Sequence, residues 1–294
     1  MKLTTQDLNT LCATAIEAAK KAGELINSYT DKTLTIKNKK GADSLAAQVV
    51  TEVDVKAQDV ILEVLAPTLT KYDLALLSEE SVDDKSRFEK DYFWCIDPMD
   101  GTLAFTEKTP GYAVSIALVS KNGKSQIGVV FDPVTGILYN AVKGEGAFKN
   151  NQPWQPNLSF ENNACFTLHM DRTFLNHPKF EFIKTEIQQF ASDAGLSEFE
   201  IQKRAGGVLN AIWVLNNPGC YFKLPKPTPG GGSLWDFAAT ACIINEAKAY
   251  GKSFDGSPLD LNREDSCFMN HKGILYASNN QVATKVREIV NSFI

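Results

Sequence analysis

The sequence contains no long apolar run and no closely paired cysteines. No stretch of the 294 residues approaches the ~18 consecutive apolar residues expected of a membrane-spanning helix. The N-terminal segment lacks the continuous apolar core of a signal peptide. None of the six cysteines forms a C-x-x-C pair, which argues against a disulfide framework and against a thiolate zinc site. These absences predict a protein of the reducing cytoplasm.

Basic charge and histidine are also scarce. Lysine and arginine number 30 against 35 acidic residues, which gives a formal net charge of −5. This balance predicts no basic surface, and therefore neither a nucleic-acid polymer nor a membrane as partner. The three histidines show no metal-ligand spacing. The hydrophobic fraction of 44% is typical of a globular protein with a sizeable core.

Apolar periodicity predicts a mixture of helices and strands. Residues 8–29 have the spacing of an amphipathic helix, and a second helix begins near Thr51 and is predicted to end at Pro67. Short apolar strands and Gly-containing turns between residues 113 and 142 indicate an antiparallel meander. The second half alternates between strands and helices. The sequence therefore predicts an α+β or layered α/β fold.

A polar segment divides these two patterns. Residues 150–157 contain two prolines and no apolar run, which favours a boundary between subdomains. We predict an N-terminal α+β subdomain over residues 1–152 and a C-terminal α/β subdomain over residues 153–294. The first would carry most of the candidate metal ligands, and the second would carry Asp236 and the loops that determine substrate specificity.

Acidic residues stand where apolar elements meet loops. Glu79 follows a predicted strand, and Asp97 and Asp100 follow the next, where Pro98 is predicted to end the strand. Asp236 opens a strongly apolar helix. Carboxylates packed together repel one another unless they share cations. Oxygen-only ligands favour Mg²⁺ or Mn²⁺, so these positions predict a divalent-metal site.

Three segments in this order resemble the signature motifs of the inositol monophosphatase superfamily. They are Ser78–Ser81, Asp97–Thr102 and Trp235–Ala239, and Val50–Asp54 is similar to a fourth acidic site. The resemblance covers nearly the whole chain. It implies an αβαβα sandwich of the inositol monophosphatase and fructose-1,6-bisphosphatase type. It also implies a lithium-sensitive, Mg²⁺-dependent phosphomonoesterase.

The resemblance implies two or three Mg²⁺ ions per site, with Mn²⁺ as a substitute. Glu79, Asp97 and the Met99 carbonyl would bind the first ion. Asp97, Asp100 and Asp236 would bind the second. Two metals held in this way can bind both the nucleophile and the leaving oxygen of an in-line displacement.

The remaining roles follow the same resemblance. Thr102 and Glu79 would orient and deprotonate the attacking water, and Asp54 would polarise a water in a more weakly bound third-metal region. The residues expected to contact the substrate are Asp100, Gly101, Thr102, Gly206 and Gly207.

The identity of the phosphate ester stays open between alternatives. Val50–Asp54 and Lys143–Phe148 resemble the inositol monophosphatase branch, which favours an inositol-monophosphate-like substrate. Gly256–Leu261 and Arg263–Ser266 resemble bacterial 3′(2′),5′-bisphosphate nucleotidases, which hydrolyse 3′-phosphoadenosine 5′-phosphate. Pro229 stands seven residues before Asp236, where inositol-type members carry a glutamate that binds ring hydroxyls. An alternative of another class is a non-catalytic protein that binds a phosphate ligand on the same fold.

The loop Lys223-Leu224-Pro225-Lys226 bears on the same question. It would either meet a second phosphate of the substrate or form an ordinary solvated loop, and its composition favours the solvated loop. The expected partner is a small phosphorylated substrate, and a homodimer is left open.

Overall fold

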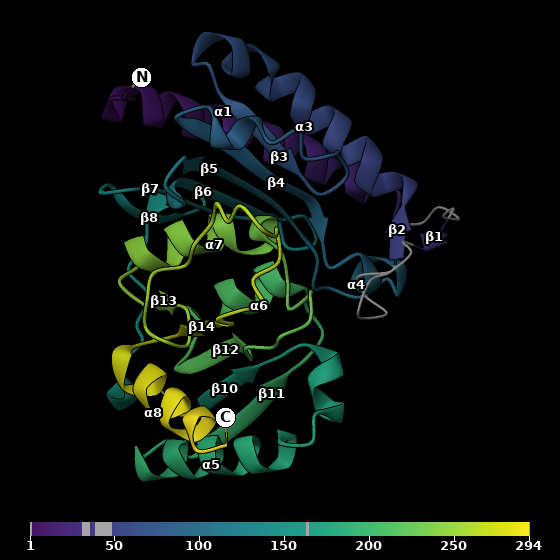
Figure 1. The fold of residues 1–294 in the computed structure, drawn as a ribbon. Helices are drawn as coiled ribbons and strands as arrows, with labels where there is room; N and C mark the ends of the chain where they lie inside the picture. The colour runs from purple at the N-terminus through teal and green to yellow at the C-terminus, as the bar shows by residue number, and fades with distance from the viewer. Residues whose placement is uncertain (1, 31–35, 39–48, 163–164, 294) are drawn as a thin grey trace.

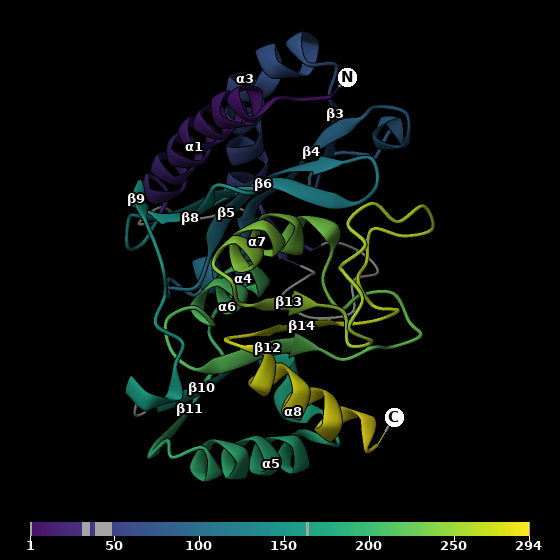
Figure 2. The ribbon, with the colours of Figure 1, turned by 90° about the vertical axis from the view of Figure 1, so that its left-hand side faces the viewer.

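The computed structural model describes residues 2–30, 36–38, 49–162 and 165–293. Its elements are stacked as helix, sheet, helix, sheet and helix layers (Figure 1). Figure 2, turned by 90°, shows the same layers from the side. Three apolar clusters occupy the spaces between successive layers. The predicted layered αβαβα architecture is thus confirmed.

The outer helix layer consists of α1 (Thr5–Asn27) and α3 (Glu52–Lys71). Small buried alanines on α1 face the sheet and α3, and Gly23 lies so close to the sheet that an added Cβ would lie 2.3 Å from the Phe131 ring. The prediction that Pro67 ends the second helix is wrong. Buried residues on both sides of the proline, Leu65 and Thr68, continue the packed face, and this packing outweighs the local propensity.

The first sheet has seven strands in sequential order. Its first pair is parallel and the others are antiparallel, so the predicted meander is confirmed. The central strands are buried on both faces because helices cover each side. The strands are β3 (Ala75–Ser78), β4 (Tyr92–Asp100), β5 (Ala113–Ser120), β6 (Lys124–Asp132), β7 (Ile137–Val142), β8 (Gly146–Lys149) and β9 (Gln152–Pro153).

The middle helix layer contains α6 (Gly207–Trp213) and α7 (Leu234–Glu246). Helix α7 is apolar around most of its circumference because it lies between the two sheets. It approaches β6 so closely that a Cβ on Gly128 would lie 2.2 Å from the Ala239 carbonyl oxygen. The short helix α4 (Thr102–Thr106) follows β4 directly.

The second sheet has the order β11-β10-β12-β14-β13. Its outer face is covered by α5 (Phe180–Asp193) and α8 (Asn280–Asn291), which form the last layer. The strands are β10 (Cys165–His169), β11 (Glu198–Gln202), β12 (Gly219–Lys223), β13 (Tyr250–Lys252) and β14 (Ile274–Ala277). Short elements complete the chain: β1 (Ile36–Asn38), β2 (Val49–Thr51), and the 3₁₀ turns η1 (Ser86–Phe88), η2 (Phe160–Asn162) and η3 (Arg172–Asn176).

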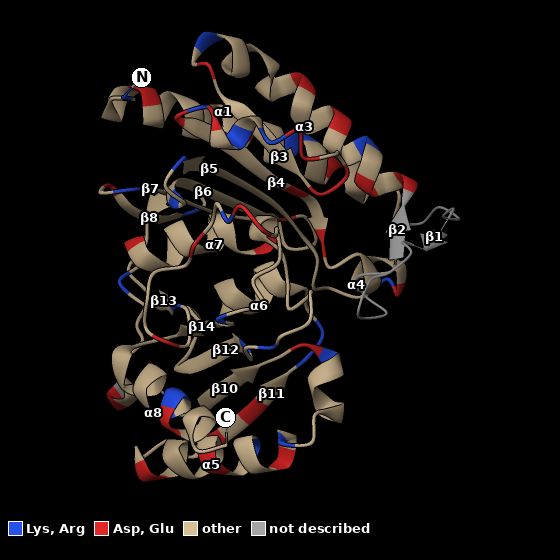
Figure 3. Cartoon of the chain, viewed as in Figure 1, with Lys and Arg blue, Asp and Glu red and all other residues tan. Residues whose placement is uncertain are grey.

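The chain passes from the first sheet to the second between β9 and β10. Helix α7 lies in the second half of the chain yet packs against β4 to β7, and the division into two subdomains stays a prediction. Among the described residues, no helix is both long and apolar enough to cross a membrane. Acidic and basic residues are interspersed along the ribbon in Figure 3.

Candidate active site

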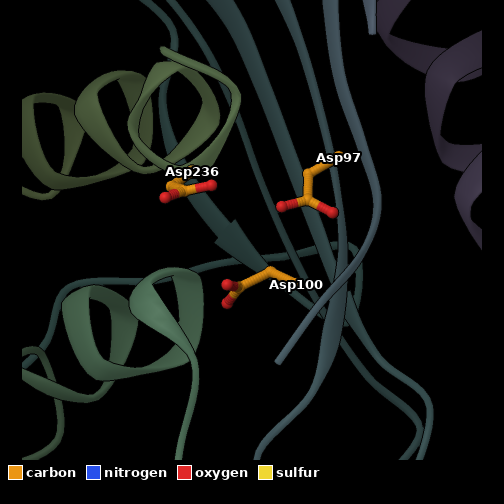
Figure 4. A group of neighbouring side chains, drawn as sticks. All are labelled: Asp97, Asp100 and Asp236. Atoms are coloured by element: carbon orange, nitrogen blue, oxygen red, sulfur yellow. The ribbon is translucent and has the colours of Figure 1, made fainter. Parts of the chain in front are cut away.

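Three aspartates converge between the end of β4 and the start of α7 (Figure 4). One carboxylate oxygen from each of Asp97, Asp100 and Asp236 lies within 4.8 Å of the others. Asp97 is buried and the other two are half-buried. A set of three convergent carboxylates fits a hard divalent cation such as Mg²⁺, which takes oxygen ligands.

A bulge in β4 brings Asp97 and Asp100 to the same side. Residues three apart in a regular strand point to opposite faces of the sheet. Here Asp97 pairs with Ser115 and Asp100 pairs with Ala113, so β4 has one more residue than its partner over this step. The prediction that the strand ends at Asp97-Pro98 is therefore wrong, because a bulge accommodates the proline within the strand.

The carboxylate of Asp100 is held by the first turn of α6. The backbone N–H groups of Gly207 and Val208 donate to its two oxygens at 3.1 Å and 2.8 Å. Gly206 lies against the same carboxylate, since an added Cβ would lie 2.3 Å from Asp100 Oδ2. Gly206 and Gly207, predicted to contact substrate, thus adjoin the cluster, and their substrate role stays a prediction.

Asp236 is the third residue of α7, in the first turn of that helix. Its Oδ2 accepts a hydrogen bond of 2.9 Å from the backbone N–H of Ser233. The preceding Gly232 has φ +83, a conformation that side chains disfavour, and its Cβ would meet the Phe237 ring at 2.4 Å. A glycine turn therefore sets the direction in which α7 presents Asp236.

The electrostatics of this cluster are unfavourable without cations. Burial raises the pKa of Asp97 well above its usual value, and the negative charges of Glu79 and Asp100 raise it further. Burial and then the charge of Asp236 raise the pKa of Asp100 in the same way. Burial also raises the pKa of Asp236, against the opposing effect of Lys223. Bound divalent cations would remove this penalty.

Glu79 lies beside the cluster, outside the group of three. Strands β3 and β4 are parallel with Ser78 opposite Ile96, so Glu79 and Asp97 follow paired positions. The backbone N–H of Glu79 donates to the Ile96 carbonyl at 3.1 Å. After burial, the charge of Glu79 is the largest influence that raises the pKa of Asp97.

Asp54 and Thr102 form a second contact near the cluster. Asp54 is buried in the first turn of α3, and Thr102 opens α4. The Thr102 hydroxyl lies 2.9 Å from Asp54 Oδ1 and 3.2 Å from the Met99 carbonyl oxygen. Gly101, which precedes Thr102, has φ +87, and a Cβ there would lie 2.5 Å from the Gly111 carbonyl oxygen. The turn after Asp100 thus requires glycine.

Sequence reasoning did not single out Gln58. Its side chain is buried on α3, where it accepts a hydrogen bond from Ser78 Oγ and donates one of 2.9 Å to Ser81 Oγ. These two serines flank Glu79 and Glu80, so α3 fixes this turn from both sides. A signal was present, because Gln58 follows Asp54 by four residues and therefore shares its helix face.

Asp171 and Lys223 form an ion pair on the other side of the cluster. Lys223 ends β12, its side chain is 17% exposed, and its Nζ lies 2.8 Å from Asp171 Oδ2. The interpretation of Lys223 as part of a solvated loop is therefore wrong, while Lys226 is half-buried. The Tyr221 hydroxyl donates to Asp171 Oδ1 at 3.0 Å. Sequence reasoning missed Asp171 because no motif surrounds it.

The pKa of Lys223 reflects its position. Burial by itself lowers this pKa, but the charges of Asp171, Asp236 and Asp100 outweigh burial and raise it. The Lys223 ammonium thus belongs to the same electrostatic environment as the three aspartates.

Comparison with known proteins agrees with this fold and identifies its family. The chain matches the inositol monophosphatase family over residues 7–291. It is 31% identical to an inositol-1-monophosphatase of Synechocystis over 87% of this chain and 83% of that protein. It is 34% identical to a histidinol-phosphatase of Chlorobaculum parvum over 79% of this chain and 87% of that protein.

A solved structure agrees at the level of the fold. An inositol monophosphatase from Anabaena superposes with a TM-score of 0.68 at 22% identity, covering 97% of each chain. The family match and the layered fold together define a phosphatase of a family that acts on small phosphate substrates. The chain belongs to the inositol monophosphatase family.

Proposed function

We propose that this protein is a Mg²⁺-dependent phosphomonoesterase that hydrolyses a small phosphate ester with a metal-activated water. The convergence of three carboxylates within 4.8 Å supports the proposal most strongly. These groups repel one another in a largely buried place, and such an arrangement is favourable only with cations bound. Oxygen ligands alone favour Mg²⁺, with Mn²⁺ as a substitute.

The residues of the cluster divide between two expected ion positions. Asp97, Asp100 and Asp236 would hold one ion. Asp97, Glu79 and the Met99 carbonyl would hold the other. When bound, such ions supply Lewis-acid polarisation of the phosphate and an acidified water.

Thr102 and Glu79 would orient and deprotonate the attacking water. The Thr102 hydroxyl has one proton, and Asp54 Oδ1 accepts within 2.9 Å. With its proton donated there, the hydroxyl oxygen is an acceptor and can receive a hydrogen bond from water. Glu79 would then take the water's second proton as general base. The backbone N–H groups of Gly101 and Thr102 would contact phosphate oxygens.

For the substrate we propose a polyol phosphate of the inositol monophosphate type. The first half of the chain supports this choice through Val50–Asp54 and Lys143–Phe148. The relative named inositol-1-monophosphatase supports it as well.

Lys223 favours a second candidate, a substrate with another anionic group. Pro229 stands where inositol-type members carry a glutamate that binds ring hydroxyls, and it is exposed in a loop. The basic side chain near Asp236 is instead Lys223, whose Nζ lies 6.0 Å from the centroid of the neighbouring Phe237 ring. An ammonium offers three donors, and Asp171 occupies one of them. The others suit a second phosphate, as in a 3′(2′),5′-bisphosphate nucleotide.

The test is a kcat/KM comparison at one Mg²⁺ concentration. The substrates are inositol 1-phosphate, 3′-phosphoadenosine 5′-phosphate, fructose 1,6-bisphosphate and, because of the relative named histidinol-phosphatase, histidinol phosphate. The ratios report differential transition-state binding. A preference for the adenosine bisphosphate above about tenfold, or ~1.4 kcal/mol, would replace the polyol proposal. Hydrolysis of none of them, with Mg²⁺ present, would favour a non-catalytic phosphate-binding protein.

A cytoplasmic location is part of the same proposal. All six cysteines are free thiols in the structure, and four of them are buried. Buried free thiols are ordinary in a reducing compartment. Fractionation of cells with an antibody against the chain would test the location.

A further inference from the structure

A fully buried arginine lies outside the acidic cluster and has no part in the chemistry proposed above. Arg87, in the short turn η1 after the loop that carries Glu79, has an exposed fraction of 0%. Its Nε donates to Asp83 Oδ2 at 2.9 Å. Its guanidinium carbon lies 4.0 Å from the centroid of the Phe88 ring. A buried guanidinium is costly unless its donors are all bound. Its partners therefore show what it connects.

The other donors of Arg87 reach the loop between β13 and β14. Nη1 donates to Asn262 Oδ1, and Nη2 donates to the Arg263 carbonyl at 3.0 Å. Asn262 returns a hydrogen bond of 3.2 Å from its Nδ2 to the Arg87 carbonyl. Figure 2 shows this loop, in yellow-green, rising from the second sheet beside the first. Arg87 thus joins two segments separated by 175 residues.

The same loop is bound to the start of α7. The Leu234 N–H donates to the Cys267 carbonyl at 2.8 Å, and the Met269 N–H donates to the Gly232 carbonyl at 2.9 Å. Cys267 Sγ also lies 3.9 Å from Arg87 Nη2. These strand-like contacts flank Ser233, whose N–H holds the Asp236 carboxylate. A continuous path of hydrogen bonds therefore runs from Arg87 to the first turn of α7.

On its other side Arg87 is connected to Glu79 through a short loop. Asp83, which accepts from the guanidinium, stands four residues after Glu79, and its side chain is only 12% exposed. The turn between them is fixed to α3 by Gln58. The Glu79 turn is thus anchored at its start by Gln58 and at its end by Arg87.

We infer that Arg87 is a positioning residue that sets the distance between Glu79 and Asp236. Glu79 follows a strand of the first sheet and Asp236 lies in the first turn of α7, so the two carboxylates come from different layers. The loop from residue 253 to residue 273 is bonded to the start of α7, and Arg87 joins this loop to the segment that carries Glu79. The inference rests on the proposed divalent-metal site. Residues that orient metal ligands from outside typically change metal affinity by 10–100-fold when altered.

The test compares two arginines changed in the same way. Arg87→Lys keeps the charge but loses the planar fork that reaches three acceptors at once. The control is Arg287→Lys on α8, where the arginine Nε donates to the Phe254 carbonyl at 2.7 Å. This substitution disturbs the same loop where it is joined to α8, and not where it is joined to Asp83 or to the start of α7. For each protein, Mg²⁺ binding is measured by isothermal titration calorimetry, and Tm is measured without metal.

We expect Arg87→Lys to raise the Mg²⁺ Kd by about tenfold, while Arg287→Lys leaves it unchanged even if Tm falls. The Mg²⁺ concentration for half-maximal activity should rise in parallel, and kcat should recover when Mg²⁺ is saturating. Asp83→Asn, which keeps the shape of the partner, should raise the Kd in the same direction and serves if Arg87→Lys does not fold.

An unchanged Mg²⁺ Kd in both Arg87→Lys and Asp83→Asn, with a lower Tm alone, would overturn the inference and leave Arg87 as a stabilising residue only. The wild type separates this outcome from a failure of the proposed function. If the wild-type protein binds no Mg²⁺ in the calorimeter, the metal-dependent function itself is wrong and the inference falls with it.

Discussion

Two strand ends, those of β4 and β12, lie beside Gly207. Like charges repel at the first, and opposite charges pair at the second. At the end of β4 stand carboxylates whose repulsion raises their pKa values, as the environment of Asp97 shows. At the end of β12 stands the Asp171–Lys223 pair, in which the two charges balance each other. A Cβ on Gly207 would lie 3.4 Å from the Tyr221 hydroxyl and 3.7 Å from Asp236 Cβ, so the two arrangements are close neighbours.

This difference indicates that the two arrangements have different roles. The repulsion in the first arrangement would be removed by bound cations, as the proposed catalytic metal site requires. The second is already neutral, so it does not need a metal and can instead provide directional donors and acceptors for a substrate. Changes to the first should therefore affect turnover with every substrate, and changes to the second should affect the choice among substrates.

The largest expected effect is that of Asp97→Asn. Loss of the carboxylate central to the cluster should lower turnover by several orders of magnitude, because it disturbs both expected ion positions. The fold should survive, since the substitution relieves repulsion in the metal-free state. The measurements are kcat at saturating Mg²⁺ and Tm without metal.

Asp132→Asn is the matched control for this variant. Asp132 is also a buried aspartate at a strand end, but its Oδ1 accepts from the N–H groups of Val134 and Thr135 in a turn. The Asp132→Asn substitution should leave turnover close to that of the wild type. Near-wild-type turnover in Asp97→Asn would refute the metal assignment.

Competing cations should have the next largest effect. Ca²⁺ prefers longer bonds and looser geometry than Mg²⁺, so Ca²⁺ in excess of Mg²⁺ should remove most of the activity. Li⁺ should also inhibit, as the family resemblance implies. Initial rates with a fixed substrate and increasing Ca²⁺ or Li⁺ provide the measurement. Rates that do not change in excess Ca²⁺ would argue against a compact Mg²⁺ site.

Lys223→Gln should separate the two arrangements. If the substrate has a second anion, this variant should lower kcat/KM for 3′-phosphoadenosine 5′-phosphate about tenfold more than for adenosine 3′-phosphate, since a charge-assisted hydrogen bond contributes ~1.5–3 kcal/mol. Lys272→Gln is the control, because Lys272 pairs with Asp255 on the surface. An equal loss with both substrates would show that Lys223 does not recognise the second phosphate.

The smallest expected effect on activity belongs to a residue away from the cluster, whose influence is on stability. Burial lowers the pKa of His169 from 6.5 to about 3, and within the described chain neither ring nitrogen has a hydrogen-bond partner. Below pH 6.5 the unfolded state binds a proton that the folded state does not, so stability falls by about 1.4 kcal/mol per pH unit from this group as pH decreases toward 3.

His169→Phe tests this effect. The phenyl ring keeps an aromatic neighbour for Trp213, whose ring centroid lies 6.3 Å from that of His169. The slope of unfolding free energy against pH, measured with urea between pH 4 and 6.5, should decrease in the variant. A slope equal to that of the wild type would mean that His169 does become protonated in the folded state.

The layered fold could be predicted from the sequence because the apolar residues of most of its elements recur with helix or strand periodicity. The amphipathic helix predicted over residues 8–29 corresponds to α1, and the strands predicted between residues 113 and 142 correspond to β5, β6 and β7. Strands such as β11 and β13 were missed, because β11 has only two apolar residues, Phe199 and Ile201, and β13 is only three residues long. Edge strands of this kind form through pairing with a neighbour rather than through their own propensity.

The site was accessible only in part, for a similar reason. The acids of the motifs could be found because they stand at element ends. The bulge that brings Asp97 and Asp100 together depends on pairing with β5, which local sequence does not encode. Asp171, Gln58 and Arg87 lie outside any motif and enter only through contacts made by distant segments. The roles assigned to the individual acids stay predictions.

The two amide groups of α6 that hold Asp100 have a consequence for how quickly and tightly an ion can bind. A free aspartate must give up rotamer freedom when it becomes a ligand, and that loss of conformational entropy weakens binding. For Asp100 the loss has already occurred during folding, because Gly207 and Val208 fix both oxygens. Each oxygen keeps a further lone pair for a cation. As a metal ligand, Asp100 would thus have completed its ordering before any ion arrives.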